Sequence, residues 1–406
     1  MKSNWKKVKL SDICDVRDGT HDSPKRTTEG RFLITSKHIK GGKIDLSSAY
    51  KISLKDFDMV NQRSKVDQWD ILLSMIGTIG EVCIVKEEPD FAIKNVGLIK
   101  TNDEILSLYL YYYLKTPTAQ SDILARLKGT TQQYLSLGEI RSFPISIPQD
   151  DRVMRKITKI LSSIDDKIEL NNKINRNLEA QAQAIFKSWF IDFEPFKNGK
   201  FIDSELGKIP EGWVCKKLKD FVEIKRGSSP RPIQDYLSGS GYNWLKISDA
   251  TSESSPFIFN IKEHIKKSGI SQTVYLVAGE LVLSNSATPG IPKFLDVNTC
   301  IHDGWLWFSN SKLSYEFLYL FFLHKRRDFI SLGNGSVFTN LKTDIVKDAL
   351  FVYPNKAVMD EFDKITKTIF ENIKIRSRES QRLTQLRDAL LPKLMSGELT
   401  ISDYIV

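Results

Sequence analysis

Two stretches of this chain, WKKVKLSDICDVRDG at residues 5–19 and WVCKKLKDFVEIKRG at residues 213–227, are copies of one pattern. Both begin with tryptophan and end with glycine, and the offset is 208 residues at both ends (213 minus 5, and 227 minus 19). The matched pairs are Trp5 with Trp213, Leu10 with Leu218, Asp12 with Asp220, Val16 with Ile224 and Gly19 with Gly227. Such a repeat predicts two copies of one structural unit.

Later blocks of the two copies stay collinear and keep nearly the same offset. The matching blocks are DILLSMIGTIG (70–80) with ELVLSNSATPG (280–290), AIKNVGLI (92–99) with CIHDGWLW (300–307), and GTTQQYL (129–135) with GSVFTNL (335–341). Chance matches would not keep this order, so we expect the whole domain to be duplicated.

Each copy combines short β-type runs with a helical aromatic segment. Residues Val82–Val85 and Ile145–Ile147 have the composition and length of strands. The aromatic residues of Tyr109–Tyr113 and Phe317–Phe322 recur at helical spacing, which is more often a core face than a binding platform. We therefore expect each copy to be an α/β or α+β globule.

A helix with a seven-residue period follows each globule. Its apolar positions are spaced 4, 3, 4, 3, the pattern of a coiled-coil seam. The first seam is Ile157, Leu161, Ile164, Ile168, Asn171, Asn175, Leu178, Ala182, Ile185 and Trp189, and the second is Phe362, Ile365, Ile369, Asn372, Arg376, Glu379, Leu383, Leu386 and Leu390.

Both seams have a polar interruption near the middle, so antiparallel pairing would bring the two polar centres together. Two separate amphipathic helices, each lying on its own globule, are the alternative. We favour an antiparallel coiled coil. The predicted organisation is a globular domain at 1–149, a central helical region at 150–194, a linker at 195–212, a second globular domain at 213–354 and a C-terminal helical region at 355–406.

Composition limits the class of protein. Lys and Arg number 59 against 50 Asp and Glu, a formal net charge of +9, which favours a polyanionic partner such as nucleic acid. The four cysteines form no CxxC pair, so neither a zinc site nor a redox motif is indicated. The N-terminus lacks the apolar region of a signal peptide, and the run FLYLFFL is too short to cross a membrane. We expect a soluble, cytoplasmic protein.

These features together resemble the specificity subunits of type I restriction–modification systems. The duplicated globule with its helix matches that family's two target-recognition domains alternating with two helical spacer regions. Local matches are AIFKSWFIDFEPF (184–196), LGKIPEGW (206–213) and LRDALLPKLMSGEL (386–399). The segment DILLSMIGTIG resembles the family's DILxSxxGTxG pattern, and the second copy departs from it at Ala287-Thr288-Pro289-Gly290.

The resemblance implies a function in DNA recognition. Such a subunit reads a bipartite double-stranded target, one half per domain. Two adenine methyltransferase subunits dock on its helices, and two ATP-dependent restriction subunits complete the complex. The cofactors S-adenosylmethionine, ATP and magnesium belong to those partners, so the resemblance implies that this chain binds none.

Sequence motifs for catalysis are missing. There is no Asn-Pro-Pro-Tyr loop of an adenine methyltransferase and no GxxxxGK[ST] phosphate loop. Glu223-Ile224-Lys225 fits the E-x-K fragment of a nuclease site, but the aligned first copy has Asp15-Val16-Arg17, so we interpret it as a strand with polar side chains outward. The five histidines are scattered and indicate neither a metal site nor an acid–base pair.

Three segments of each copy combine turn residues with side chains that contact bases or phosphates. The first holds Ser23, Lys25 and Arg26, with Arg226, Ser228, Ser229 and Arg231 opposite. The second holds Ser36, Lys37 and His38, with Lys246, Ser248 and Asp249 opposite. The third holds Lys128, Gly129, Thr130, Thr131, Gln132, Gln133 and Tyr134, with Asn334, Gly335, Ser336, Thr339 and Asn340 opposite.

The third segment is the best candidate, because its two copies share a glycine and a following leucine yet differ in the polar residues between. Two readers of different half-sites would differ in this way. A hydrophilic surface loop is the alternative interpretation. Two other functions stay open from sequence alone: a self-sufficient duplicated methyltransferase or nuclease, and a coiled-coil tether whose globules bind protein.

If the helices set the gap between half-sites, lengthening both should lengthen the gap. Inserting seven residues after Asn175 and seven after Arg376 keeps the seam phase and adds about 10 Å of helix. We expect a gap longer by about three base pairs at ~3.4 Å each. Methylation mapping would check this, and a one-residue insertion is the control that breaks the seam. An unchanged gap would show that the helices are not the ruler.

Overall fold

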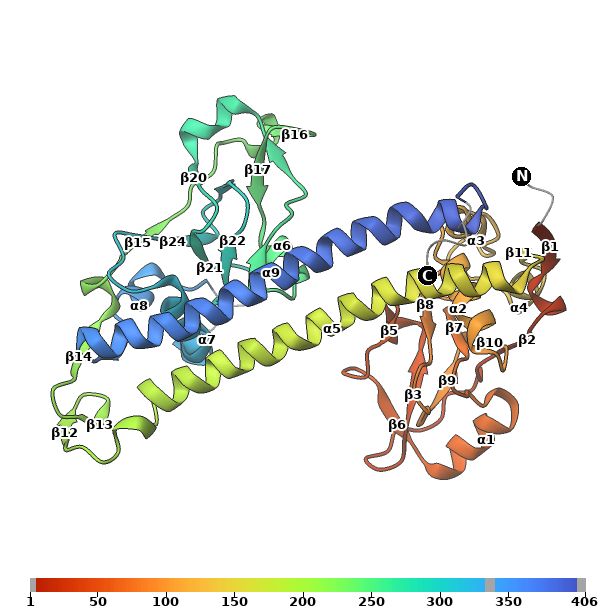
Figure 1. Cartoon of the computed structure of the whole chain (residues 1–406), viewed down its shortest axis with the longest axis horizontal. Coiled ribbons are helices and arrows are strands. Elements are labelled where there is room, and N and C mark those ends of the chain that lie inside the picture. Colours follow the sequence, from red (N-terminus) through yellow and green to blue (C-terminus); the bar gives the residue numbers. More distant parts are fainter. Residues whose placement is uncertain (1–4, 333–339, 400–406) are drawn as a thin grey trace. The chain divides into compact units, whose positions relative to one another are not determined.

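A computed structural model gives the fold and describes residues 5–332 and 340–399. The chain forms two compact units, which we call the first unit (residues 1–167 with 382–406) and the second unit (residues 168–381). Each unit contains one repeated domain and part of both long helices, α5 (Asp151–Phe190) and α9 (Lys356–Met395). Figure 1 shows α5 and α9 as continuous helices.

The first unit is built on an antiparallel sheet in the order β2-β10-β7-β8. A smaller sheet has the order β6-β3-β9, with β3 parallel to β9, and two-stranded ribbons form from β1 with β11 and from β4 with β5. The strands are β1 Trp5–Lys9, β2 Asp15–Asp18, β3 Arg31–Thr35, β4 Ile39–Lys40, β5 Lys43–Ile44, β6 Tyr50–Ile52, β7 Ile71–Ser74, β8 Val82–Ile84, β9 Phe91–Lys94, β10 Val96–Lys100 and β11 Pro144–Pro148. The short helices are α1 Leu54–Ser64, α2 Glu104–Leu114, α3 Pro117–Ala125 and α4 Leu137–Arg141.

The second unit has sheets in the orders β15-β24-β21-β22-β18 and β16-β19-β17-β23-β20, and two-stranded ribbons from β12 with β13 and β14 with β25. The strands are β12 Phe201–Ser204, β13 Gly207–Pro210, β14 Val214–Lys217, β15 Glu223–Arg226, β16 Leu237–Ser238, β17 Tyr242–Leu245, β18 Phe257–Ile258, β19 His264–Ile265, β20 Val274–Leu276, β21 Leu281–Ser284, β22 Pro292–Leu295, β23 Thr299–Ile301, β24 Trp305–Ser309 and β25 Leu350–Tyr353. The helices are α6 Ile247–Ser252, α7 Tyr315–Leu332 and α8 Thr343–Lys347.

The two domains share one topology, so the predicted duplication is confirmed. The strand order β2-β10-β7-β8 recurs as β15-β24-β21-β22, and the parallel pair β3–β9 recurs as β17–β23. The register recurs with a shift of one residue against the sequence alignment: Val16 pairs with Ile99 in the first copy, and Ile224 pairs with Phe308, one residue beyond Trp307, in the second. The predicted mixed helix and sheet class is therefore correct.

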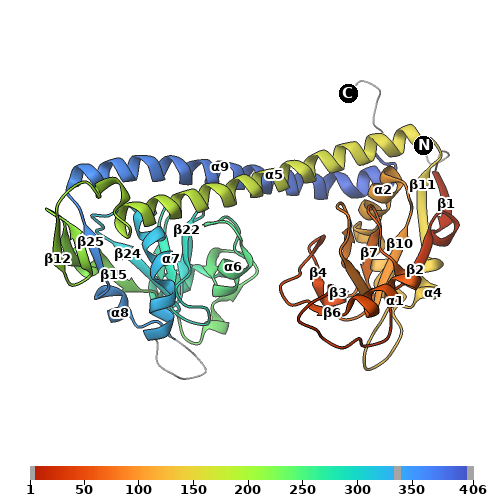
Figure 2. The ribbon, with the colours of Figure 1, turned by 90° about the horizontal axis from the view of Figure 1, so that it is seen from below.

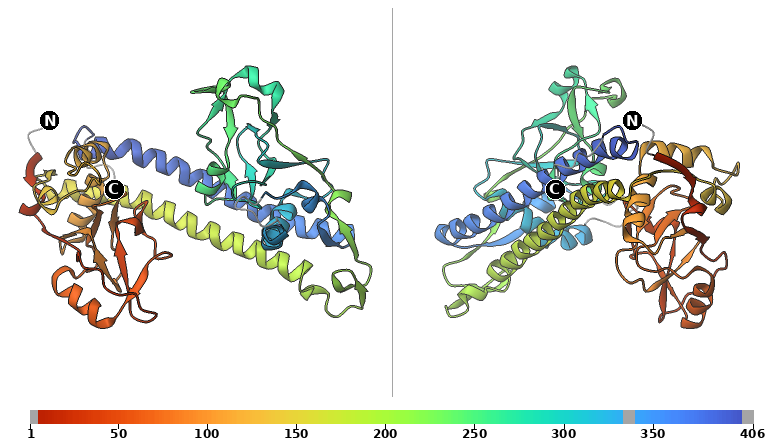
Figure 3. Two further views of the ribbon diagram at one scale, coloured as in Figure 1. Left: turned by 180° about the vertical axis from the view of Figure 1, so that it is seen from behind. Right: turned by 45° about the vertical axis from the view of Figure 1, so that its right-hand side comes forward.

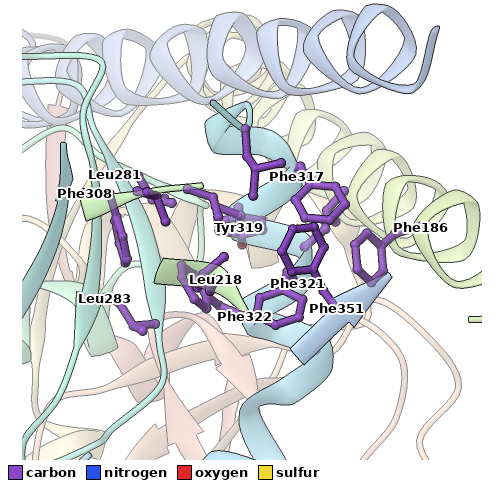
Figure 4. Packing of buried hydrophobic residues seen from close by; sticks show 14 of the residues in the cluster. Phe186, Leu218, Leu281, Leu283, Phe308, Phe317, Tyr319, Phe321, Phe322 and Phe351 are labelled. Carbon is purple, nitrogen blue, oxygen red and sulfur yellow. The ribbon is translucent and has the colours of Figure 1, made fainter. Parts of the chain in front are cut away.

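The predicted aromatic helices are core elements. In α2, residues Tyr109–Tyr112 are all buried, and Asp103 caps the helix by accepting a hydrogen bond from the Leu106 amide (2.9 Å). In the second unit, α7 packs against the sheet that contains β22 and β24 (Figure 2). Phe317 and Phe321 of α7 lie close to Phe351 of β25, and Phe186 of α5 packs beside Phe317 (Figure 4).

The long helices follow the predicted pattern with one correction. All ten predicted seam positions of α5 are buried or half-buried. In α9 the most deeply buried stripe starts at the predicted Phe362 and from Thr366 on lies one residue later than predicted, while Leu386 of the predicted seam is 48% exposed. The stripe is Phe362, Thr366, Phe370, Ile373, Ser377 and Ser380, and it continues at Leu391 and Leu394. The shift arises because α9 also packs on a domain core: Phe370 contacts the rings of Phe294 and Tyr319.

The polar centre of the helix pair forms as predicted within the second unit. Asn171 is fully buried, and its Nδ2 donates to Glu379 Oε2 (2.9 Å) and Ser380 Oγ (3.3 Å). Asn175 Nδ2 donates to Ser377 Oγ (3.0 Å). Phe186, further along α5, meets Phe362 near the start of α9, so the two helices run antiparallel and side by side here (Figure 3).

The segment predicted as a linker, 195–212, is a folded hairpin. Strands β12 and β13 pair antiparallel, with Gly207 at a positive φ of 93° beside the turn. Ile209 is 1% exposed, and the ring of Phe196 lies 4.8 Å from that of Trp213. The glycine and charge content of this segment predicted a linker, but its few apolar side chains pack on the domain that follows.

The register of α9 can be tested with two leucines of the first unit. Leu394→Ala should lower the free energy of unfolding by about 2–5 kcal/mol, because Leu394 is 1% exposed in the core. Leu386→Ala, at a predicted seam position that is exposed, should change it by less than about 0.5 kcal/mol. Urea denaturation of the isolated chain checks both. Equal costs would contradict the observed register.

Candidate nucleic-acid interface

The turn after the central strand of each domain is held by one serine. Ser74 Oγ donates to Thr78 O and accepts from the Glu81 amide (2.9 Å), while the Ser74 carbonyl accepts from the Gly80 amide (3.1 Å). Ser284 makes the same set, with Thr288 O (2.6 Å), the Ile291 amide (2.9 Å) and the Gly290 amide (2.7 Å). Both serines are fully buried, so each turn is fixed to the end of its strand.

The departure of the second copy from the glycine pattern leaves the backbone geometry unchanged. Gly77 has a φ of 76°, and Ala287 at the equivalent position has a φ of 58°. Gly80 and Gly290 match in the same way, at 92° and 78°. Ala287 therefore stands in the left-handed region, where a residue with a Cβ is strained.

In the first unit, residues of this turn contact both the second and the third predicted segments. The Ser36 hydroxyl donates to Asn95 O (3.0 Å) and accepts from the Met75 amide (3.2 Å). The Leu135 amide donates to Met75 O (2.9 Å), and Tyr134 forms a bridge with Ile76. The loop 128–134 is thereby attached to the residues that follow β7.

The loop 128–134 exposes all of its side chains. It is closed by two backbone hydrogen bonds of 2.9 Å between Lys128 and Tyr134. Gly129 has a φ of 91°, and a Cβ there would lie 2.5 Å from Gln132 O, so only glycine fits. Lys128 pairs with Glu139 (3.2 Å). The other predicted residues of the loop are exposed: Thr130, Thr131, Gln132, Gln133 and Tyr134.

The first predicted segment joins the same region through Asn95. Asn95 accepts the Ser36 hydroxyl at its backbone, and its side chain lies 2.8 Å from His21 Nδ1. Close by in sequence, Ser23 Oγ accepts a hydrogen bond from Lys94 Nζ. The guanidinium of Arg26 lies 4.8 Å from the Tyr50 ring centre. Lys25 and Arg26 are exposed.

Two predicted contact residues of the second segment are instead buried. Ser36 is 5% exposed and His38 is fully buried, with His38 Nδ1 accepting from the Thr35 amide (2.9 Å). Burial and the adjacent Lys37 charge lower the pKa of His38. Ser36 and His38 therefore shape the loop from inside, and Lys37 alone of the three presents its side chain to solvent.

Sequence reasoning missed His21, Lys94 and Asn95. His21 Nε2 lies 3.0 Å from the buried carboxylate of Asp18, which is also paired with Arg63. The available signal was position: His21 begins the segment HDSPKRTTEGR, from which Ser23, Lys25 and Arg26 were chosen, and Lys94 and Asn95 lie within a repeated block.

The second unit repeats this convergence. The Leu341 amide donates to Asn285 O (2.7 Å), as Leu135 does to Met75 in the first copy. Arg226 Nε donates to Asp303 O, and Ser229 Oγ donates to Asp303 Oδ1 (3.1 Å). Ser228 Oγ donates a hydrogen bond to Gln272 O (3.0 Å).

A pocket of about 580 Å³ brings two predicted segments of the second unit together. Ser229 and Arg231 of the first segment line it, together with Lys246 and Ser248 of the second segment and Ala287 of the turn. Asp249 of the second segment is buried and caps the Lys246 amide (3.0 Å). Asn340 is exposed, and Asn334, Gly335, Ser336 and Thr339 lie outside the described residues.

The E-x-K fragment lies in a strand with its polar side chains outward, as predicted. In β15, Ile224 is buried while Glu223 and Lys225 are exposed. The hydrogen bond from Lys225, followed by those from Asn310 and Ser309, lowers the pKa of Glu223 to about 2. Among residues 5–332 and 340–399, no group of three or more His, Cys, Asp or Glu is arranged to hold a metal ion. No helix in that part of the chain is long and apolar enough to span a membrane.

Comparisons with known proteins all point to one protein family. The family model described as "Type I restriction modification DNA specificity domain" matches twice, at residues 2–180 and 210–385. The chain is 29% identical over 342 residues to the type I restriction enzyme MjaIX specificity subunit of Methanocaldococcus jannaschii, covering 82% of this chain and 78% of that protein. It is 26% identical over 364 residues to the HindI specificity subunit of Haemophilus influenzae, covering 72% and 77%.

A solved structure shares the fold. The S subunit of a type I restriction–modification system from M. genitalium aligns with a TM-score of 0.61 at 17% identity, covering 96% of both chains.

The equivalent turn positions allow a reciprocal test of backbone strain. Ala287→Gly should raise the free energy of unfolding of the second unit by about 0.5–1 kcal/mol, because the loss of the left-handed penalty outweighs the chain entropy that glycine adds to the unfolded state. Gly77→Ala should destabilise the first unit by about 1 kcal/mol or more, although a Cβ there meets nothing within 4 Å. Denaturation midpoints measure both, and unchanged midpoints for the pair would exclude strain at this turn.

Proposed function

Because the chain belongs to the family of type I restriction–modification DNA specificity domains, we propose that it is the DNA-recognition subunit of such a complex. In this proposal it reads a bipartite target, with one half-site for each domain. The observation that carries it is the duplicated turn. The same hydrogen-bonded scaffold stands in both domains, and different polar residues surround it.

The first domain offers the two kinds of contact that a DNA reader needs. Lys25, Arg26 and Lys37 are exposed cations suited to phosphates, which fix position without reading sequence. Gln132 and Gln133 carry amides that can bond both edge atoms of an adenine in the major groove. Since the loop that holds them is closed by backbone bonds, its side chains can vary without changing the scaffold.

Catalysis belongs to partner subunits in this proposal. The sequence has neither a methyltransferase loop nor a phosphate-binding loop, which supports a subunit that directs chemistry without performing it. We infer two adenine methyltransferase subunits and two ATP-dependent restriction subunits as partners. S-adenosylmethionine, ATP and magnesium would be bound by them.

Exchange of one domain tests the proposal. Replacing residues 213–354 with the matching domain of a relative should change one half-site of the methylated sequence and leave the other intact. Long-read methylation mapping in cells that express the chain with its methyltransferase partner measures this. Alteration of both half-sites, or the absence of any defined methylated sequence, would contradict independent reading.

Single residues of the first domain give a finer test. If Gln132 or Gln133 bonds a base edge, its change to alanine should cost roughly 1–3 kcal/mol of discrimination at one base pair. Lys25→Ala should weaken binding to all sequences alike and reduce its salt dependence. Fluorescence anisotropy with target and non-target duplexes at several salt concentrations separates the two effects. A uniform loss for the glutamine variants would place them on the DNA backbone.

A further inference from the structure

The two domains connect the same pair of strands in different ways just beyond the strand ends. Strands β7 and β10 of the first domain pair in the same register as β21 and β24 of the second, and the matched pairs are Ser74 with Val96 and Ser284 with Trp305. In the second domain the next backbone position closes directly, because the Asn285 amide donates to Gly304 O (2.9 Å). Hydrogen bonding between these strands therefore extends one residue past their ends.

In the first domain a serine hydroxyl takes the place of that direct bond. Met75 and Asn95 are the residues equivalent to Asn285 and Gly304. Ser36 Oγ accepts from the Met75 amide (3.2 Å) and donates to Asn95 O (3.0 Å), so the hydroxyl is inserted between the two backbone groups. Ser36 is 5% exposed. Buried amides and carbonyls need hydrogen-bond partners, and here one hydroxyl serves both.

The second domain has an apolar side chain at the position of Ser36. The parallel strand pairs align Ser36 with Ile247, because Ile34 pairs with Ile93 in the first domain and Leu245 pairs with Ile301 in the second. Ile247 is buried in an apolar cluster, and its side chain can neither donate nor accept a hydrogen bond. The bridged connection is therefore a property of the first domain alone.

The Ser36 bridge ties two of the predicted contact segments to the sheet. Lys37 of the second segment is the chain neighbour of Ser36 and is exposed. On the other side of the bridge, Met75 O accepts from the Leu135 amide (2.9 Å), and Leu135 directly follows the loop 128–134. The bridge thus sets where this loop stands relative to Lys37.

The first segment is tied to the same bridge through Asn95. The side chain of Asn95 lies 2.8 Å from His21 Nδ1, while its backbone carbonyl accepts the Ser36 hydroxyl. Loss of the hydroxyl would leave the amide of Met75 and the carbonyl of Asn95 unpaired, or let them close into a direct bond of about 2.9 Å as in the second domain. Either result moves the segments relative to one another.

From this difference between the domains we infer that Ser36 is a positioning residue of the first domain, which acts on DNA reading without touching DNA. Its inserted hydroxyl fixes the separation between the ends of β7 and β10, and with it the arrangement of Lys37 and the loop 128–134 on one half-site. The inference rests on the proposed function and adds to it a residue that controls half-site reading from inside the domain.

The Ser36→Ala variant, in complex with the methyltransferase partner, tests the inference. Binding to the mapped target is compared with binding to duplexes that carry single-base changes in either half-site. Because alanine keeps the fold and removes the bridge, we expect discrimination within the first half-site to fall by about tenfold. Discrimination within the second half-site should stay unchanged, since its domain contains no such bridge.

Three further variants separate the bridge from packing and stability. Ser36→Cys fills the same space with a much weaker hydrogen-bonding group and should behave like Ser36→Ala, whereas Ser36→Thr keeps a hydroxyl and should retain discrimination within about twofold. Ser64→Ala is the matched control, because Ser64 is also fully buried in this unit and its Oγ donates to Val60 O (3.2 Å) within α1. It should lower the urea midpoint of the chain without changing discrimination.

The outcomes distinguish failure of the inference from failure of the proposed function. Unchanged discrimination by folded Ser36→Ala, an equal loss for Ser64→Ala, or an equal loss within both half-sites would overturn the inference while the bipartite target remains. If the wild-type complex methylates no defined sequence, the proposed function itself fails.

Discussion

Burial of one face of a 40-residue helix is the constraint on which each unit depends. A helix of this length in water needs a partner for its apolar stripe, because most helical stability comes from packing of that face. In the second unit the partner is both the other helix and a domain. Phe362 of α9 is fully buried against Phe186, Trp189 and Phe190 of α5 and against Phe317 of α7. The helix pair and the domain therefore form one core.

The helix pair also has a buried polar centre, which is distinct from that apolar core. Asn171 and Asn175 use buried amides on Ser380, Glu379 and Ser377, where apolar residues would pack without preference for register. Ser377 also lies 3.1 Å from Ser255 of the domain, and Arg378 pairs with Asp296 at the end of β22. The register of α9 is thus linked to the orientation of the second domain's sheet.

The serine-locked turn has the same backbone scaffold in both domains and different polar side chains around it. Ser74 and Ser284 hold the same backbone path although one turn has Gly77 and the other has the strained Ala287. Strain is retained at sites where the surrounding structure determines the conformation. Around this point the first domain places an exposed loop of amides and hydroxyls, and the second places a pocket with a carboxylate and an imidazole. The two domains can therefore recognise different sequences with one fold.

The sequence by itself determined the duplication, the mixed fold class and the antiparallel helices, because these follow from repetition and from the period of apolar residues. It also located the segments that surround the site, since turn residues and polar side chains mark loops. Only the tertiary structure decided which side chains face outward. Ser36 and His38 look like contact residues in sequence but are buried, because local pattern does not reveal which face of a short loop packs inside. The buried stripe of α9 lies one residue later than predicted because a second packing partner, distant in sequence, also covers part of the helix surface. Glu263 and His302 line one pocket because β17 pairs with both β19 and β23, which no local pattern specifies.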